Sequence, residues 1–274
     1  QSARAELART APLQPEIAPI SAEEETAANE AERVWVETNR AAPLVMDPAL
    51  MQDENPAPAT DSTETGTEPK VDRTVGSPPC TYATIAAAMS AAVNGDRLLL
   101  EGGVTFNEHL SIHKSLTFQG GYNGCGSGLS TPTTINGTGN GRVMYIFENL
   151  TIGLENLILT NGATTGYGAG IISLSNSQIT GNNVQIHGNT STSLGGGIYL
   201  QGARAIFTNS NIYNNAALAG AGVYGAAITT FYPVLDLQSS ADIHGNQALT
   251  GSGLGGGVYM DQGTVTLADC SDIY

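Results

Sequence analysis

The sequence has few basic side chains and no apolar stretch long enough to cross a membrane. Only 10 of its 274 residues are Lys or Arg, against 25 Asp and Glu, so the formal net charge is -15. A chain this acidic repels a phosphate backbone or an anionic membrane surface. It also has no run of about 18 apolar residues, the minimum for a membrane span. Nucleic acid and bilayers are therefore not expected partners.

Cysteine and tryptophan are also scarce. Three cysteines cannot all pair within one chain. Cys80 and Cys125 flank one compact segment and are the candidate disulfide, which would indicate an oxidising compartment; Cys270 is left over. Three buried free thiols are the alternative. Trp35 is the one tryptophan, and with Val34 and Val36 it forms an apolar spot in a polar region.

Glycine and proline are distributed unevenly and divide the chain in two. Only Gly66 precedes Gly76 among 34 glycines, whereas 10 of the 12 prolines lie at or before Pro79. Residues 1–75 hold 15 acidic and 6 basic side chains and are predicted to be an acidic, Pro-rich arm with one short helix. Within it, Val34, Trp35 and Val36 either rest on the protein's own surface or pack on another subunit. Residues 76–274 form the second predicted domain.

A glycine-rich turn followed by a β-branched residue occurs four times after residue 150. The copies are Gly168-Ala169-Gly170-Ile171, Gly195-Gly196-Gly197-Ile198, Gly220-Ala221-Gly222-Val223 and Gly255-Gly256-Gly257-Val258. Three of them continue into Tyr199, Tyr224 and Tyr259. Each turn is preceded by an aliphatic residue three positions before an asparagine, at Asn161, Asn189, Asn215 and Asn246. Such a period is typical of a solenoid.

Stacking of these repeats predicts two ladders. Short identical strands pair at about 4.8 Å through their backbones, so equivalent side chains lie above one another. Asn161, Asn189, Asn215 and Asn246 are expected to form an amide ladder at a bend, since asparagine also tolerates the left-handed conformation. The three tyrosines are expected to form an aromatic ladder. Residues that build every coil are interpreted as scaffold.

Two segments carry a resemblance to known families. TIAAAMSAAVNGDRLLL (84–100) predicts a helix within 81–93, a stop at Asn94-Gly95 and a strand, and VTFNEHLSIHKSLTFQGGYNGC (104–125) predicts short strands. Together they resemble the N-terminal cap and first coils of pectin-lyase-like proteins, over about residues 80–150. The later repeats resemble the passengers of chlamydial polymorphic outer-membrane proteins, with Ile in place of Phe in their Phe-x-x-Asn motif.

The resemblance implies an all-β, right-handed parallel β-helix with a short N-terminal capping helix, exposed at a cell surface. Residues 80–125 would be the cap and first coils, and residues 150–274 the glycine and asparagine repeats. No membrane-barrel domain follows in this sequence, so an autotransporter is not expected.

The repeat is broken by two expansions, where function is expected: one lies within Gly225 to Leu237, and a second, Ala248 to Leu254, lengthens the following turn. Six extra residues lie between Gly225 and Leu237, where Phe231 and Tyr232 either face a partner or pack on the coil beneath. At the C-terminal end, residues 271–274 realign with residues 210–213, just before the next ladder asparagine would come. Either the natural protein continues or another molecule covers this coil, because an uncovered strand edge invites pairing.

Enzyme chemistry is not expected. Many β-helices are polysaccharide lyases or hydrolases, which need several converging carboxylates. Here the acids after residue 230 are scattered, at Asp236, Asp242, Asp261, Asp269 and Asp272. Four of them could bind calcium near the open end, although a solvated acidic face is the alternative. His187-Gly188 and His244-Gly245 occupy equivalent positions and are interpreted as a ladder rather than a catalytic pair. No metal or cofactor is predicted.

Two functions follow from these patterns. The first is an extracellular structural protein, a homo-oligomer or filament subunit that assembles by stacking of coil ends and exchange of the N-terminal arm. The second is an adhesin fragment that binds a glycan or protein ligand through its side loops. A carbohydrate-active enzyme is the third.

Overall fold

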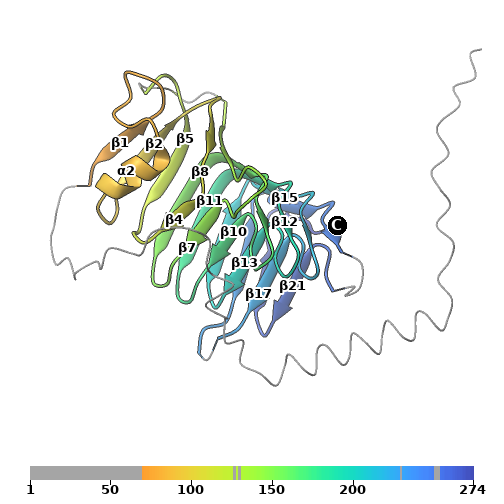
Figure 1. The fold of residues 1–274 in the computed structure, drawn as a ribbon. Helices are drawn as coiled ribbons and strands as arrows, with labels where there is room; N and C mark the ends of the chain where they lie inside the picture. Colours follow the sequence, from red (N-terminus) through yellow and green to blue (C-terminus); the bar gives the residue numbers. More distant parts are fainter. Residues whose placement is uncertain (1–69, 126–127, 129–130, 229, 250–253) are drawn as a thin grey trace, which may run out of the picture. The chain divides into compact units, whose positions relative to one another are not determined.

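The computed structural model describes residues 70–125, 128, 131–228, 230–249 and 254–274. They form a parallel β-solenoid of about seven turns with one short helix, so the predicted fold class is confirmed (Figure 1). No helix in this part of the chain is long and apolar enough to cross a membrane. Val34, Trp35 and Val36 lie outside the described residues.

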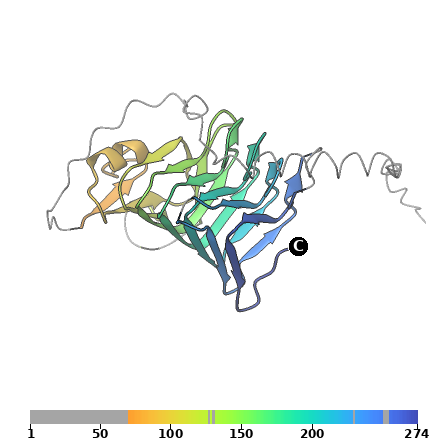
Figure 2. The same cartoon turned by 90° about the horizontal axis from the view of Figure 1, so that it is seen from below.

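The strands form three parallel sheets, named here A, B and C. Sheet A holds β1 (Asp72–Val75), β2 (Arg97–Glu101), β3 (Thr105–Asn107), β5 (Thr117–Tyr122), β6 (Thr133–Asn136), β8 (Thr151–Thr160), β11 (Gln178–His187), β14 (Arg204–Thr208), β15 (Asn211–Tyr213), β18 (Val234–Gln238), β19 (Asp242–His244) and β22 (Thr264–Leu267). Sheet B holds β4 (Leu110–Ile112), β7 (Met144–Ile146), β10 (Ile171–Ser173), β13 (Ile198–Gln201), β17 (Val223–Ala226) and β21 (Val258–Asp261). Sheet C holds β9 (Ala163–Thr164), β12 (Thr190–Ser191), β16 (Ala216–Ala217) and β20 (Gln247–Ala248). Figure 2 shows successive coils stacked along each sheet.

Columns of apolar side chains fill the inside of the solenoid. Because side chains alternate between the two faces of a strand, every second residue points inward and stacks on its equivalent in the next coil. Three columns run through sheet A to the C-terminal coil. They are Ile152-Ile179-Ala205-Leu235-Val265, Leu98-Phe118-Leu154-Gly181-Phe207-Leu237-Leu267 and Ile135-Leu159-Ile186-Ile212-Ile243-Ile273.

One column contains a glycine where its neighbours have large side chains. A Cβ on Gly181 would overlap the ring of Phe207, which is 1% exposed in the next coil. The missing side chain therefore makes room for the phenyl ring and keeps the column filled.

Helix α2 (Ile85–Ala91) lies within the predicted 81–93 segment and covers the N-terminal end of the solenoid (Figure 1). Ile85 and Ala88 are fully buried and belong to the same apolar core as the first coils. Both helix ends are held by side chains of the second coil. The Glu108 carboxylate accepts from the Ile85 and Ala86 N–H groups at 2.8 Å, and Lys114 Nζ donates to the Ala92 carbonyl at 2.7 Å.

Asp96 is a fully buried carboxylate that ties the first two coils together. It accepts hydrogen bonds from the backbone N–H groups of Val71 (2.8 Å) and Val93 (3.0 Å) and from Arg73 Nε (2.7 Å). Burial alone would raise the pKa of Asp96, but these hydrogen bonds and the Arg73 charge outweigh it and hold the pKa below its usual value.

We therefore expect Asp96→Asn to lower the free energy of unfolding by about 2 kcal/mol or more at neutral pH, because Arg73 would lose its partner charge. A lowered folded-state pKa stabilises the fold above the unfolded pKa of about 3.9, and this stabilisation is lost as pH falls below it. The gap between wild type and variant should be constant from neutral pH down to about pH 5 and narrow below pH 4. Urea unfolding between pH 3 and 7 measures the free energy of unfolding of both proteins. A difference that does not change with pH would contradict the role of the ionised Asp96 carboxylate.

Candidate functional site

Three of the four predicted ladder asparagines stack at one corner of the solenoid. Asn189 Nδ2 donates to Asn215 Oδ1 and Asn215 Nδ2 donates to Asn246 Oδ1, both at 3.0 Å. Each Oδ1 also accepts from the backbone N–H of the preceding asparagine, at 3.0 Å. Asn189 and Asn215 are 0% and 1% exposed, so these amides satisfy backbone groups where water cannot reach.

Asn161 does not belong to this ladder, which corrects the prediction. Thr160 pairs with His187, so the register places Asn161 beside Gly188, one residue before the ladder position. Gly162 occupies that position and donates its N–H to Asn189 Oδ1 at 2.8 Å. Asn161 instead takes the bend, with φ of 57°, as Gly188 does with φ of 65°. The coil is one residue shorter than the spacing of asparagines suggests.

Other left-handed bends are made by asparagines that the sequence did not single out. Asn156 and Asn183 have φ of 53° and 54° and stack through their amides at 2.7 Å. Asn149 and Asn176 do the same at 2.9 Å. The ladder asparagines therefore hold the coil by hydrogen bonds, whereas a different set supplies the turns.

The tyrosines form a column on the outer face of sheet B. Tyr199 stacks on Tyr224 and Tyr224 on Tyr259, with ring centroids 5.5 and 5.0 Å apart. Tyr167, which directly precedes the first glycine motif, stacks on the other face of Tyr199 at 4.8 Å. With Ile172 and Leu194, these rings form an apolar cluster separate from the solenoid core.

Tyr199 is fully buried, and its hydroxyl is the one buried side-chain polar atom without a partner among the residues that the structure describes. Burial raises the pKa of Tyr199 and of Tyr224 well above the usual value. Both hydroxyls therefore stay protonated over the physiological range.

A second aromatic column lies on the outer face of sheet A. His187, Tyr213, His244 and Tyr274 stack in that order, with centroids 4.7, 5.2 and 5.3 Å apart. Burial lowers the pKa of His187. The two histidines predicted to stack thus occupy one column with Tyr213 between them, and they do not form a side-by-side pair.

The C-terminal coil exposes side chains that belong to the core. Val265, Leu267 and Ile273 end the three columns of sheet A and are 37%, 48% and 36% exposed. Their equivalents one coil earlier, Leu235, Leu237 and Ile243, are at most 1% exposed. Strand β22 pairs with β18 on one side and is the last strand of its sheet. This surface, defined by Val265, Leu267 and Ile273, is called the C-terminal face below.

The extra residues after β17 form a small projecting hairpin. Ile228 and Phe231 exchange backbone hydrogen bonds at 2.9 and 2.7 Å. A Cβ on Gly202 would come within 2.7 Å of Phe231 Cβ, so Phe231 lies against the preceding coil and is 38% exposed. Tyr232 is 55% exposed. Phe231 therefore packs on the coil, as one alternative predicted, and a partner for Tyr232 stays a prediction.

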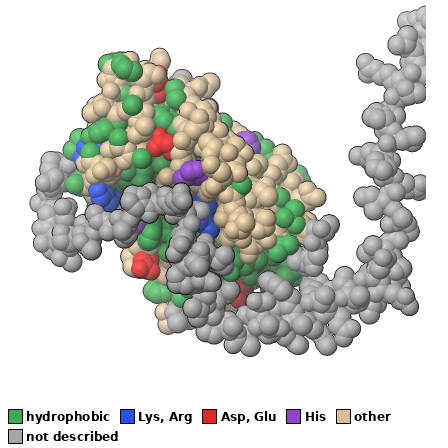
Figure 3. All heavy atoms as spheres, viewed as in Figure 1, with side chains coloured by type: hydrophobic (Ala, Val, Ile, Leu, Met, Phe, Trp, Pro, Cys, Tyr) green, Lys and Arg blue, Asp and Glu red, His purple; other side chains and the backbone are tan. Residues whose placement is uncertain are grey.

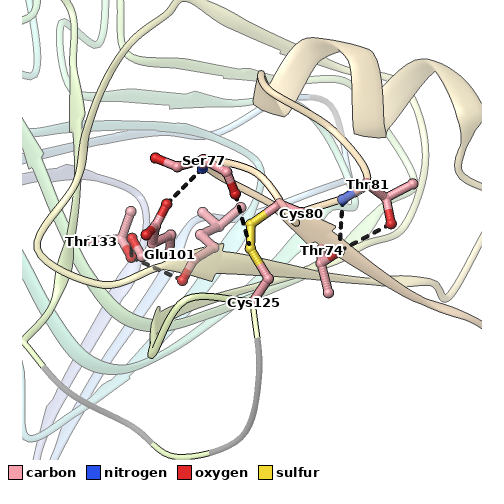
Figure 4. Close-up of a disulfide and its surroundings, with 8 residues drawn as sticks. Thr74, Ser77, Cys80, Thr81, Glu101, Cys125 and Thr133 are labelled. Atoms are coloured by element: carbon pink, nitrogen blue, oxygen red, sulfur yellow. Dashed lines mark hydrogen bonds between the residues drawn. A yellow bond between two sulfur atoms is a disulfide. The ribbon is translucent and has the colours of Figure 1, made fainter.

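Charged groups are few and widely spaced on the visible face (Figure 3). Within the described ranges, the only group of three or more potential metal ligands is Cys80, Glu101 and Cys125. Asp242, Asp261, Asp269 and Asp272 are not brought together in this way. Cys80 and Cys125 form a disulfide (Figure 4). Cys270 is free and exposed.

These features define a parallel β-solenoid protein with an internal asparagine ladder and two external aromatic columns. Comparison with protein-family models, with curated proteins and with solved structures gave no match. The expected relation to pectin-lyase-like proteins and to chlamydial passengers stays a prediction.

Proposed function

We propose that this protein is an extracellular structural protein, a subunit of a surface filament or sheath that associates through its C-terminal face. The observation that supports the proposal is that three core columns run into the last coil of the described residues, where Val265, Leu267 and Ile273 can be continued by a further coil or by a neighbouring molecule. Because these side chains are already more than half buried, burying the rest of one of them stabilises a contact by about 0.5–1.5 kcal/mol. The edge of β22 adds unpaired backbone groups, which favour pairing with another strand.

The two ends of the solenoid are not equivalent, and this constrains the assembly. Helix α2 covers the core at the N-terminal end, with Ile85 and Ala88 fully buried. A C-terminal face therefore has no bare core to stack on at the N-terminal end of a neighbour. We infer that it meets either a second C-terminal face or the arm of another copy, residues 1–69, which holds Val34, Trp35 and Val36.

The extracellular location rests on the cap disulfide. Disulfides such as Cys80–Cys125 form and persist in oxidising compartments. The motif resemblance to surface passengers, which implies a right-handed coil, supports the same location.

Leu267→Asp tests the contact. A charge at this half-exposed edge position should weaken self-association tenfold or more, which corresponds to about 1.4 kcal/mol. Thr266→Asp is the matched control, because Thr266 is the adjacent exposed residue of β22 and its side chain points to the outer face. Analytical ultracentrifugation of both variants over a range of concentrations, with circular dichroism to check the fold, gives the comparison.

Two outcomes would contradict the proposal. Wild-type protein that stays monomeric at every concentration has no such contact. Equal association of Leu267→Asp and Thr266→Asp would place the contact away from the C-terminal face. Electron microscopy of the wild type beside a chain lacking residues 1–69 separates the contribution of the arm.

The projecting hairpin favours a second function, adhesion through a lateral loop. Tyr232 is 55% exposed at a place where the repeat carries extra residues, and exposed tyrosine rings are common in binding surfaces. We expect Tyr232→Ala to abolish any binding to immobilised glycans or matrix proteins, while Tyr274→Ala, equally aromatic and 77% exposed, leaves it intact. An equal loss of binding in the two variants would count against this function. So would a wild-type protein that binds none of these ligands.

A further inference from the structure

The N-terminal cap gathers two thiol side chains and one carboxylate. Cys80, Cys125 and Glu101 come from segments far apart in the sequence, and their ligand atoms all lie within 4.8 Å of one another (Figure 4). All three are partly buried. Sulfur and carboxylate oxygen are both ligands of zinc, and a site with three protein ligands leaves a fourth position for water.

The surroundings hold this cluster in place. Glu101 Oε2 accepts a hydrogen bond from the Ser77 N–H at 2.6 Å, which holds the carboxylate beside the segment that leads to Cys80. The Glu101 carbonyl accepts from Thr133 Oγ1 at 2.9 Å, which fixes the end of β2. A Cβ on Gly76 would overlap the Glu101 carboxylate and come within 2.9 Å of Cys80 Sγ. Glycine at position 76 therefore leaves the space in which these groups meet.

We propose that, when the disulfide is reduced, Cys80, Cys125 and Glu101 bind a thiophilic divalent cation such as Zn²⁺. A dithiol or phosphine reductant supplies two electrons, the S–S bond breaks and two protons make two thiols. The cation then displaces both thiol protons, which go to solvent, and forms two metal–sulfur bonds and one metal–oxygen bond. The segment between Cys80 and Cys125 is then closed by the disulfide in an oxidising compartment and by the metal ion in a reducing one.

The reduced cluster would attract a cation because it can carry three negative charges, two on thiolates and one on the Glu101 carboxylate. Two thiolates beside an ionised carboxylate repel one another, and Glu101 Oε2 accepts its hydrogen bond from the Ser77 N–H rather than from a cationic side chain. A divalent cation relieves this repulsion and replaces the lost covalent link between segments 45 residues apart.

The test uses the full chain with Cys270→Ser, which removes the third thiol as an alternative ligand. Reduced, metal-free protein is titrated with Zn²⁺ against a chromophoric chelator, and the oxidised protein serves as control. We expect one equivalent bound by the reduced form and none by the oxidised form. Glu101→Gln, which can still accept from Ser77, should weaken binding roughly tenfold or more.

Two further measurements keep the test valid when a variant is less stable than the wild type. Co²⁺ in place of Zn²⁺ should give the visible absorption of a tetrahedral thiolate site in reduced protein, and metal should raise the reduced protein's melting temperature. Binding that persists when Cys80 and Cys125 are both serine, or reduced protein that binds no metal, would overturn the proposal.

Discussion

Replacing Asn215 with alanine should lower the free energy of unfolding by about 3–5 kcal/mol. The side chain is 1% exposed and bridges three coils. Its Oδ1 accepts from the Asn189 N–H and Nδ2, and its Nδ2 donates to the Ile186 carbonyl at 2.9 Å and to Asn246. Alanine would leave these groups buried and unsatisfied, each at a cost of about 1–3 kcal/mol.

Asn211→Ala is the matched control, because Asn211 lies in the same coil on the outer, partly exposed side of β15. We expect its stability to stay within about 0.5 kcal/mol of the wild type. Urea unfolding followed by circular dichroism measures both variants. Equal stability of the two would mean that the buried ladder adds nothing beyond what a surface asparagine adds.

Gly222→Ala should destabilise the protein by about 3 kcal/mol or more, enough to populate unfolded or aggregated chains during expression. A Cβ there would clash with the Gly257 carbonyl oxygen and lie 2.8 Å from Ile243 Cγ2. The oxygen cannot move away freely, because it accepts a hydrogen bond from the Val223 N–H at 2.9 Å. The methyl group would therefore separate two coils at the corner beside the asparagine ladder.

The chain offers an in-register control for this effect. Gly257 holds the same position in the C-terminal coil, where the nearest atom to an added Cβ is Ile273 Cγ2 at 2.9 Å and no carbonyl oxygen lies close by. Ile273 is 36% exposed, so its side chain can shift away, and we expect Gly257→Ala to cost about 1 kcal/mol or less. Thermal unfolding of the two variants compares them. A Gly257→Ala variant as unstable as Gly222→Ala would show that coil stacking is not the cause.

The solenoid could be predicted because its main signals are local and repeated. Glycine motifs of constant form, with φ between 54° and 65° at Gly168, Gly195, Gly220 and Gly255, mark the same turn in successive coils. Stacking in register then follows from the period. The helix over Ile85–Ala91 could also be predicted from the sequence, because small apolar residues recur with a helical period before Asn94-Gly95.

The register of individual coils could not be read in the same way. Asn161 looked equivalent to Asn189, yet Thr160 pairs with His187, and the bend falls on Asn161 itself. A coil can lose one residue at a turn without changing its motifs, because the inward columns alone decide which residues align. The stacking of Tyr167 on Tyr199 was missed for a related reason, since Tyr167 lies in the turn and not in a strand.

The sequence by itself determined the parallel solenoid and the glycine turns, because each depends on local conformation or on a repeated spacing. It offered the pairing of Cys80 with Cys125 only as a candidate, which the structure contains. Only the tertiary structure decided which asparagines form the ladder, which core columns are left exposed at Val265, Leu267 and Ile273, and that Glu101 joins the two cysteines. These properties depend on how residues of different coils are brought together. The register between coils follows from side-chain packing across the whole solenoid, which no single repeat contains.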